Sequence, residues 1–161
     1  MINLKLMRET IAQGLSEYLG IKVIRGNQTA PAPPYPYCSY NLTTPAGENH
    51  GTWQEHEDGI DRLMVKSTWS MSFLSGDFDE SIEHALRARE WFTHSGRGWL
   101  SMHGIIVQSC TQITNRDNIL TVEYERKNGF DVFFYVYDEV QNLSETVGII
   151  EGAELARTMK E

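Results

Sequence analysis

Basic residues are few in this chain of 161 residues and never form a cluster. Lysine and arginine number 14 against 22 aspartates and glutamates, so the formal net charge is −8. Proteins that bind nucleic acid neutralise phosphates with grouped Lys and Arg side chains, so this composition disfavours a nucleic-acid-binding protein. Solubility is the simplest role for the excess of carboxylates.

Long apolar runs are also missing. No stretch approaches the roughly 20 apolar residues of a membrane-spanning helix, and the first ten residues lack the apolar core of a signal peptide. We therefore expect synthesis in the cytoplasm and no membrane partner. Cysteine is limited to Cys38 and Cys110. Without a secretion signal, buried reduced thiols are favoured over a disulfide between them.

The motifs that usually mark catalysis or metal binding are not found. His50 and His56 lie in a polar segment rich in carboxylates, but the chain has no HExxH motif, no cysteine pair and no calcium-binding loop. A solvated acidic loop is the favoured interpretation. The chain also lacks a nucleophile elbow and a glycine-rich turn between a strand and a helix. These observations predict no enzyme, no metal site and no cofactor.

Two helices are predicted from apolar residues at helical spacing. The first covers residues 4–19, where Asn3 can cap the start and Gly20 can end the helix. The second covers residues 77–94, with Asp77 as its cap and residues 95–98 as its end. Its predicted apolar stripe consists of Phe78, Ile82, Ala85, Leu86 and Phe92.

Strands are predicted between and after these helices. They cover residues 21–25, 37–43, 61–75, 104–113 and 129–140, and the segment 61–75 alternates most clearly between apolar and polar positions. Residues 119–125 are extended or turning, and residues 146–150 resemble a strand followed by a short helix. The proline-rich segment 30–37 is extended. Residues 44–60 form a long loop or an irregular hairpin. The order of elements predicts a single α+β domain, with a mainly antiparallel sheet and two helices packed on one face.

The strand at residues 129–140 is apolar on both faces. Phe130, Val132, Phe134 and Val136 point to one side, and three aromatic residues point to the other: Phe133, Tyr135 and Tyr137. A small domain rarely covers both faces of a sheet by itself. We therefore expect the second face to meet another subunit.

Several short motifs follow one another along the chain, at residues 18–25, 27–29, 33–37 (PPYPY), 67–70, 115–117 (NRD) and 124–132. Taken in order, they resemble the neck or tail terminator proteins of tailed bacteriophages. Each motif alone is weak, and their order and spacing carry the resemblance, which extends from about residue 15 to residue 151. The segment 44–60 has no counterpart in it.

The resemblance implies a structural virion protein of the tail and neck region. Such a subunit forms a ring with itself, commonly a hexamer, at the head-proximal end of the tail tube, stops tube growth and joins the tail to head-completion or connector proteins. DNA would only pass through the lumen, and an acidic lumen would repel it. Acidity spread over the surface for solubility remains the alternative. Other possible functions are a head-closure component and a cytosolic small-molecule-binding domain or enzyme with the 44–60 segment as a lid.

The candidate site residues fall into two groups. Oligomer-interface candidates are Phe133, Tyr135 and Tyr137, together with Arg116, Asp117 and Arg126. The charged residues have an equally good local alternative, in which they stabilise a turn within the subunit. Trp53 and His56 are candidates for contact with the tail tube or connector.

Overall fold

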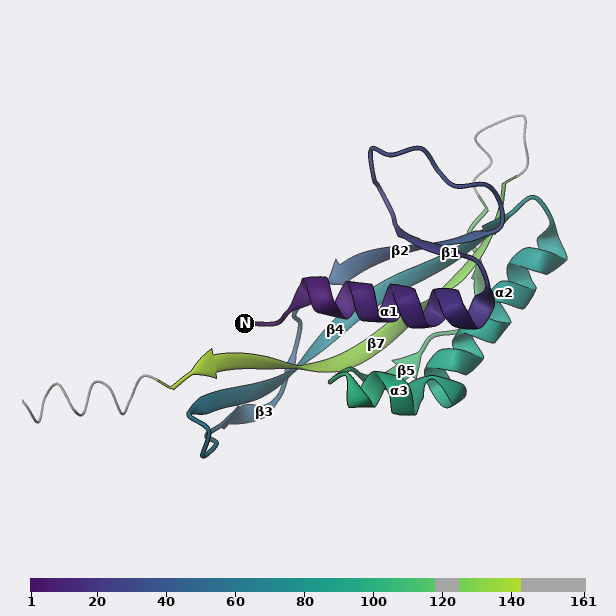
Figure 1. Cartoon of the computed structure of the whole chain (residues 1–161). Helices are drawn as coiled ribbons and strands as arrows, with labels where there is room; N and C mark the ends of the chain where they lie inside the picture. Colours follow the sequence, from purple (N-terminus) through teal and green to yellow (C-terminus); the bar gives the residue numbers. More distant parts are fainter. Residues whose placement is uncertain (118–124, 143–161) are drawn as a thin grey trace, which may run out of the picture.

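The computed structural model describes residues 1–117 and 125–142, and these residues form an α+β domain (Figure 1). The strands lie in the order β1-β2-β4-β7-β5, while β3 pairs with β4 and β6 pairs with β7. All of these pairings are antiparallel except that between β1 and β2. The predicted fold class is confirmed. The predictions for residues 119–124 and for the segment after residue 142 lie outside the described residues.

The strands have the following bounds: β1 Lys22–Arg25, β2 Tyr37–Thr44, β3 Asn49–Gln54, β4 Ile60–Ser75, β5 Ile106–Cys110, β6 Thr114–Asn115 and β7 Arg126–Gln141. The strands β4 and β7 pair along their whole length, from Ile60 opposite Gln141 to Ser75 opposite Arg126. They form the centre of the sheet, and the other strands are arranged around them.

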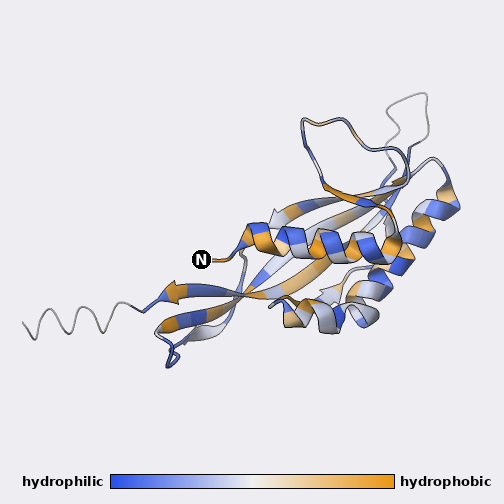
Figure 2. Ribbon diagram, in the orientation of Figure 1, coloured by the Kyte–Doolittle hydropathy of each residue, from blue (hydrophilic) through white to orange (hydrophobic). Residues whose placement is uncertain are grey.

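The first helix, α1, covers Leu4–Leu19 and has the predicted ends. The Asn3 side chain accepts a hydrogen bond from the Leu6 amide at 3.0 Å, and Gly20 adopts the left-handed conformation with φ of 72°. Apolar and polar residues alternate along α1 with the helical period (Figure 2). Ile11 and Leu15 are fully buried against the sheet, as expected for the apolar side of an amphipathic helix.

The second helix, α2, covers Phe78–Glu90, and the prediction of its apolar stripe was partly wrong. Phe78 and Leu86 are 43% and 57% exposed, and the residues in contact with the core are small: Ser81, Ala85 and Ala88. Small side chains let α2 approach the sheet closely. The Ser81 hydroxyl donates to the Phe73 carbonyl at 2.8 Å, so the two elements are joined by a hydrogen bond.

The prediction that the helical region ends at residues 95–98 was also wrong. The chain continues through a π-helical turn, Trp91–Ser95, into a third helix, α3, over Arg97–Met102. Gly96 has helical backbone angles, and a Cβ atom at this position would lie 2.3 Å from the Trp91 ring. This glycine therefore allows close packing between the turn and Trp91 and does not act as a helix stop.

The core lies between the helices and one face of the central strands. From β4 it receives Leu63, Val65, Trp69, Met71 and Phe73, and from β7 Phe130, Val132, Phe134 and Val136. Residues of α1, of α2 with the turn that follows it, and of α3 join the same cluster, so all three helices cover one face. Cys38 is a buried free thiol in this core and Cys110 a partly buried one, which agrees with the prediction of reduced cysteines.

The segment 44–60 forms an irregular hairpin, the second of the two predicted alternatives. Strand β3 pairs with the beginning of β4, with a shift of register between His50 and Gln54 where Gly51 has φ of 89°. Together with the end of β7, this hairpin projects beyond the helices as a three-stranded extension (Figure 1). We call this extension, residues 48–66 and 136–141, the arm.

Candidate assembly surfaces

The face of the sheet opposite the helices is not covered by any helix in the described part of the chain. On this open face, Thr68 pairs with Phe133, Lys66 with Tyr135 and Met64 with Tyr137. The predicted aromatic row therefore does lie on the side away from the core. Phe133 and Tyr135 are half-buried, and Tyr137 is 42% exposed.

Two polar side chains partly shield the aromatic row. The Lys66 ammonium lies 4.5 Å from the centre of the Phe133 ring, and the His50 ring lies 5.0 Å from that of Tyr135. Such contacts stabilise exposed aromatic rings by about 0.5–1 kcal/mol, which is less than full burial provides. The row is therefore stable in the free subunit, and a partner could still bury more of it.

The other half of the open face is polar and is organised by Arg116. Its guanidinium donates to the Ser70 hydroxyl at 2.6 Å and forms an ion pair with Asp131 at 3.1 Å. It also lies 3.4 Å from the Met71 carbonyl and the Ser72 hydroxyl. These partners belong to β4 and β7, so Arg116 joins two neighbouring strands within one subunit.

Gly129 makes room for this arrangement. It lies on β7 opposite Ser72, and a Cβ atom at this position would be 2.1 Å from the Met71 carbonyl oxygen and 3.2 Å from the Arg116 guanidinium. Any side chain here would push β4 and β7 apart or displace Arg116. Glycine at this position thus allows the arginine to lie flat on the sheet.

Asp117 and Arg126 also bond within the subunit. The Asp117 carboxylate accepts from the Lys127 amide at 2.6 Å and pairs with Arg126 at 3.2 Å. The hydrogen bond from Lys127 is the main reason that the pKa of Asp117 lies below its usual value, and Arg126 adds to the effect. The described contacts of Arg116, Asp117 and Arg126 thus lie within one subunit, as in the alternative in which they stabilise local structure. Their contact with a neighbouring subunit stays a prediction.

The sheet edge at β5 is occupied by two arginine side chains. Arg97 donates to the Val107 carbonyl at 3.3 Å, and Arg89 donates to the Thr111 carbonyl at 3.0 Å. Both carbonyl groups lie in or just after β5. Because an unpaired strand edge readily accepts another strand, these side chains protect β5 from such pairing.

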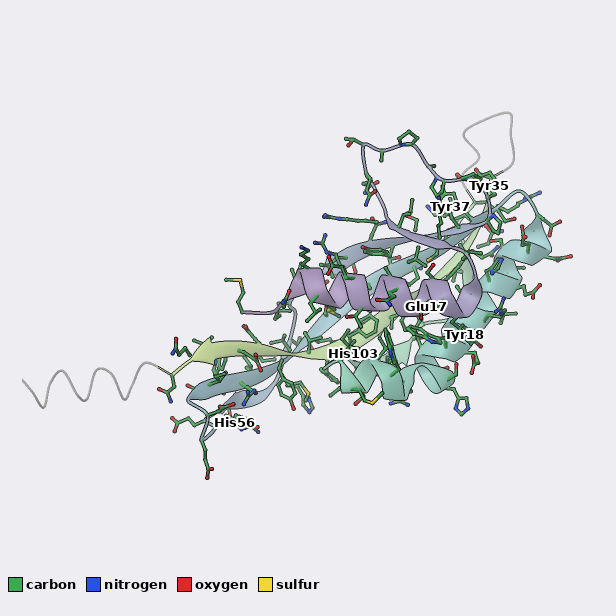
Figure 3. The ribbon with its side chains drawn as sticks, viewed as in Figure 1. Glu17, Tyr18, Tyr35, Tyr37, His56 and His103 are labelled. Carbon is green, nitrogen blue, oxygen red and sulfur yellow. The ribbon has the colours of Figure 1, made fainter. Side chains whose placement is uncertain are left out.

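The arm carries much of the negative charge of the chain. It contains seven carboxylates and two basic residues, a net charge of −5 with neutral histidines. Every residue of β3 is exposed, Trp53 is 45% exposed, and His56 lies at the far end of the arm (Figure 3). Arg62 pairs with Asp58 at 2.7 Å and with Glu139 at 2.9 Å. The side chains of Glu48, Glu55 and Glu57 form no ion pair or hydrogen bond with any described residue. Asp61 forms no ion pair with these residues either but accepts a hydrogen bond from the Asn142 side chain at 3.2 Å.

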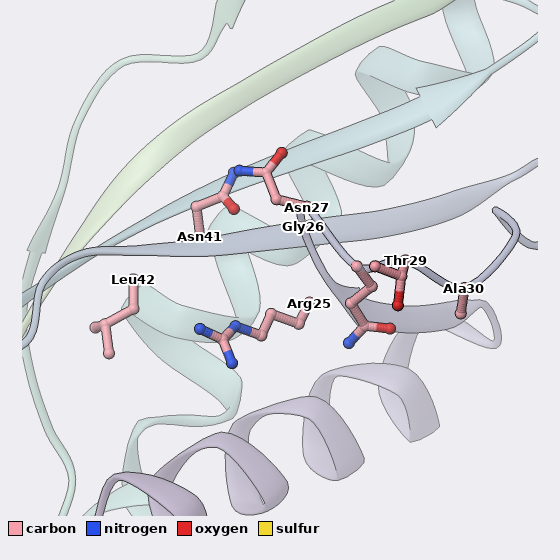
Figure 4. A pocket seen from close by; sticks show the side chains of 8 residues that line it. Arg25, Gly26, Asn27, Thr29, Ala30, Asn41 and Leu42 are labelled. Atoms are coloured by element: carbon pink, nitrogen blue, oxygen red, sulfur yellow. The ribbon is translucent and has the colours of Figure 1, made fainter.

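A polar pocket of about 640 Å³ lies between the end of β1, the following loop and β2 (Figure 4). Its lining includes Arg25, Asn27, Gln28, Thr29 and Asn41. The side chain of Arg25 extends along the pocket in Figure 4 and forms no hydrogen bond or ion pair within the described part of the chain. We call this surface the β1 pocket.

Within residues 1–117 and 125–142, no group of three or more His, Cys, Asp or Glu side chains is placed to hold a metal ion. His50 and His56 therefore do not meet their neighbouring carboxylates in such a cluster. No described helix is long and apolar enough to cross a membrane.

A small α+β subunit with one face of its sheet uncovered and a charged arm is typical of a protein that functions in an assembly. Comparison with protein families agrees with this class. The model of the family described as phage neck terminator protein matches residues 9–159, and the chain belongs to this family. It is thus a structural protein of the bacteriophage neck, and its location is the neck and tail region of the virion.

The other comparisons add little. A solved structure with 12% sequence identity aligns with 84% of this chain and 96% of its own length, with a TM-score of 0.41, which is too low to support an argument. The comparison with curated proteins found no match.

Sequence reasoning missed the partners of Arg116 and the exposed cation of the β1 pocket. Arg116 and Ser70 are 46 positions apart, and only the pairing of β6 and β4 with β7 brings them together. The signal for Arg116 was the short, polar strand β6 beside Gly129. Arg25 gave no signal, because a single arginine at the end of a predicted strand is common.

Proposed function

We propose that this protein forms a ring, with a hexamer as the expected form, at the head-proximal end of the tail tube. There it ends tube growth and joins the tail to head-completion or connector proteins. One observation supports this proposal most directly: the open sheet face keeps a row of partly exposed aromatic residues, over which the described residues place Lys66 and His50. Burial of these rings by a neighbouring copy would stabilise the ring.

A cyclic ring needs two different patches on each subunit, because each copy contacts its two neighbours through unlike surfaces. The open face supplies one patch. The arm and the β1 pocket supply two more patches, and they differ in charge because the arm is acidic and the pocket carries Arg25. Trp53 and His56 at the arm are our candidates for contact with the tube or connector, and DNA would only pass through the lumen.

The ring is tested by light scattering on the purified protein, alone and with tail tube protein. Tyr135→Asp places a charge in the aromatic row and should abolish assembly while the circular dichroism of the helices stays unchanged. The matched control is Leu86→Asp, because Leu86 is 57% exposed on a helix away from the open face. This control should assemble like the unmodified protein.

Two results would overturn the proposal. A strict monomer at all concentrations, even with tube protein present, excludes the ring. Assembly of the Tyr135→Asp variant at the same concentration as the unmodified protein excludes the open face as an interface. Loss of helix content in this variant would instead place Tyr135 in the core of the monomer.

A head-closure role is the second candidate, since several neck components share ring geometry and small α+β folds. The length of tail tubes polymerised in vitro separates the two roles. A terminator added during polymerisation should produce shorter tubes with the protein at one end. A head-closure component should leave the length distribution unchanged.

A further inference from the structure

We propose that the acidic arm of one subunit docks in the β1 pocket of its neighbour. Charge pairing between copies then fixes the orientation of each subunit relative to the next one in the ring. The proposal rests on the ring described above and specifies one of its contacts. It depends on three features of the described residues: the shape of the arm, the charges at its tip and the unpaired cations on the edge strand β1.

The projecting part of the arm adds little to the stability of a free subunit. Its strand β3 packs no residue into the core and is exposed at every position, and the tip is hydrophilic (Figure 2). Isolated hairpins are marginally stable in water, and this one is held by the pairing of its strand β4 with β7 and by Arg62. A projecting charged hairpin of this kind is suited to reach a second molecule.

The carboxylates of the arm are available for such a contact. Glu55 and Glu57 lie at the turn between β3 and β4, and neither pairs with a described residue. The two basic residues of the arm are already engaged, because Arg62 binds Asp58 and Glu139 and Lys66 lies over Phe133. The tip therefore presents uncompensated negative charge.

The β1 pocket has the opposite character. Its cation is Arg25, which is exposed and forms no ion pair or hydrogen bond with the described residues. Lys22, at the other end of β1, is also exposed and unpaired among these residues but does not line the pocket. Amide and hydroxyl groups of Asn27, Gln28 and Thr29 complete the pocket. These groups bind carboxylates well, through charge and through hydrogen bonds.

The positions of the two surfaces suit a ring. Strand β1 is one edge of the sheet, and the arm is a projection of its central strands beyond the helices (Figure 1). A contact between them is heterologous, because a patch on one copy meets a different patch on the next, and repetition of such a contact builds a ring when the rotation between copies closes. The edge at β5 is protected by Arg89 and Arg97, whereas no arginine is described in such a contact at β1.

A charge exchange between two variants tests the contact. Arg25→Glu should weaken association at low salt by about tenfold or more, and Glu55→Lys/Glu57→Lys should do the same, because each variant sets like charges against each other. A mixture of the two variants should recover assembly. In a ring in which the two variants alternate, the native arm of one variant meets the native pocket of the other. At the next contact the lysines of the changed arm meet Arg25→Glu, so the charges are exchanged but still opposite.

The control is Glu17→Lys/Glu83→Lys, which makes the same change of charge on exposed positions of α1 and α2. It should assemble normally. Association constants of all proteins are measured by sedimentation at about 50 and 500 mM salt, with tube protein if the unmodified chain requires it. Added salt should weaken the native contact and should reduce the effect of both arm and pocket variants.

The outcomes separate this inference from the proposed ring. If the unmodified protein assembles and both charge variants assemble equally well, the arm contact is wrong and the ring stands. Failure of the mixed variants to recover assembly also overturns the arm contact. If the unmodified protein stays monomeric with tube protein present, the ring fails and the arm contact fails with it.

Discussion

The two faces of the β4–β7 pair are formed by alternating residues of the same two strands and yet have different environments. On the covered face, Trp69, Phe130 and Phe134 are completely inaccessible. The Trp69 ring packs against Phe134, and the Phe92 ring packs against both Phe130 and Phe134. On the open face, Phe133 and Tyr135 are half-buried under single polar side chains. The covered face therefore accounts for most of the stability of the subunit, and the open face remains available for association. Mutations at matched positions can test this division.

The largest difference is expected between two adjacent phenylalanines. Phe134→Ala removes a fully buried ring and should lower the free energy of unfolding by about 3–5 kcal/mol. Phe133→Ala, one residue away, should cost about 1 kcal/mol, because its ring is half-exposed and mainly contacts Lys66. Urea denaturation of both variants measures the difference. Equal losses would show that the open face belongs to the core.

Gly129→Ala tests the polar half of the open face. The added methyl group would clash with the Met71 carbonyl and crowd Arg116, so we expect a loss of about 1–3 kcal/mol. The control is Gly98→Ala, because Gly98 has no atom within 4 Å of an added Cβ atom and lies in α3. This control should be neutral or slightly stabilising, since alanine is the better helix former.

Asp117→Asn should cost about 1 kcal/mol near neutral pH, because the amide replaces a charged acceptor for Lys127 and Arg126. The pKa of Asp117 is lowered in the folded protein. Its carboxylate therefore stabilises the fold above the ordinary pKa of about 3.9, and this contribution disappears as the pH falls through the lowered pKa. The difference between the two proteins should shrink when urea denaturation is repeated below pH 4. A constant difference would contradict this assignment.

The smallest effect on stability is expected at the arm. Trp53→Ala should change the free energy of unfolding by no more than about 0.5 kcal/mol, since Trp53 is 45% exposed and packs on no core residue. Its binding to tail tube or connector proteins should weaken, as measured by co-sedimentation. A large loss of stability with unchanged binding would place Trp53 among the structural residues.

The regular elements were predictable from the sequence because their signals are local. The apolar period of α1, its caps Asn3 and Gly20, and the alternation of β4 all lie within a few residues of the features that they determine. The aromatic row of the open face was predictable for the same reason, since a strand alternates its side chains by geometry.

Errors arose where tertiary packing overrides a local signal. Gly96 resembles a helix stop, but its lack of a side chain serves the Trp91 ring, and the chain turns into α3. Phe78 and Leu86 have the right spacing for a core stripe, but Ser81 and Ala85 face the sheet because they allow a closer approach. The network of Arg116 depends on strands that are distant in sequence, which no local pattern reports.

The arginines at the β5 edge have a consequence for the size of any assembly. A sheet that accepts new strands at both ends can grow without limit into a fibre. Arg89 and Arg97 each occupy one carbonyl group at one end, which hinders sheet-to-sheet growth there. A virus makes structural proteins at high concentration in a small volume, and two side chains that keep this edge from polymerising would favour finite particles over aggregates.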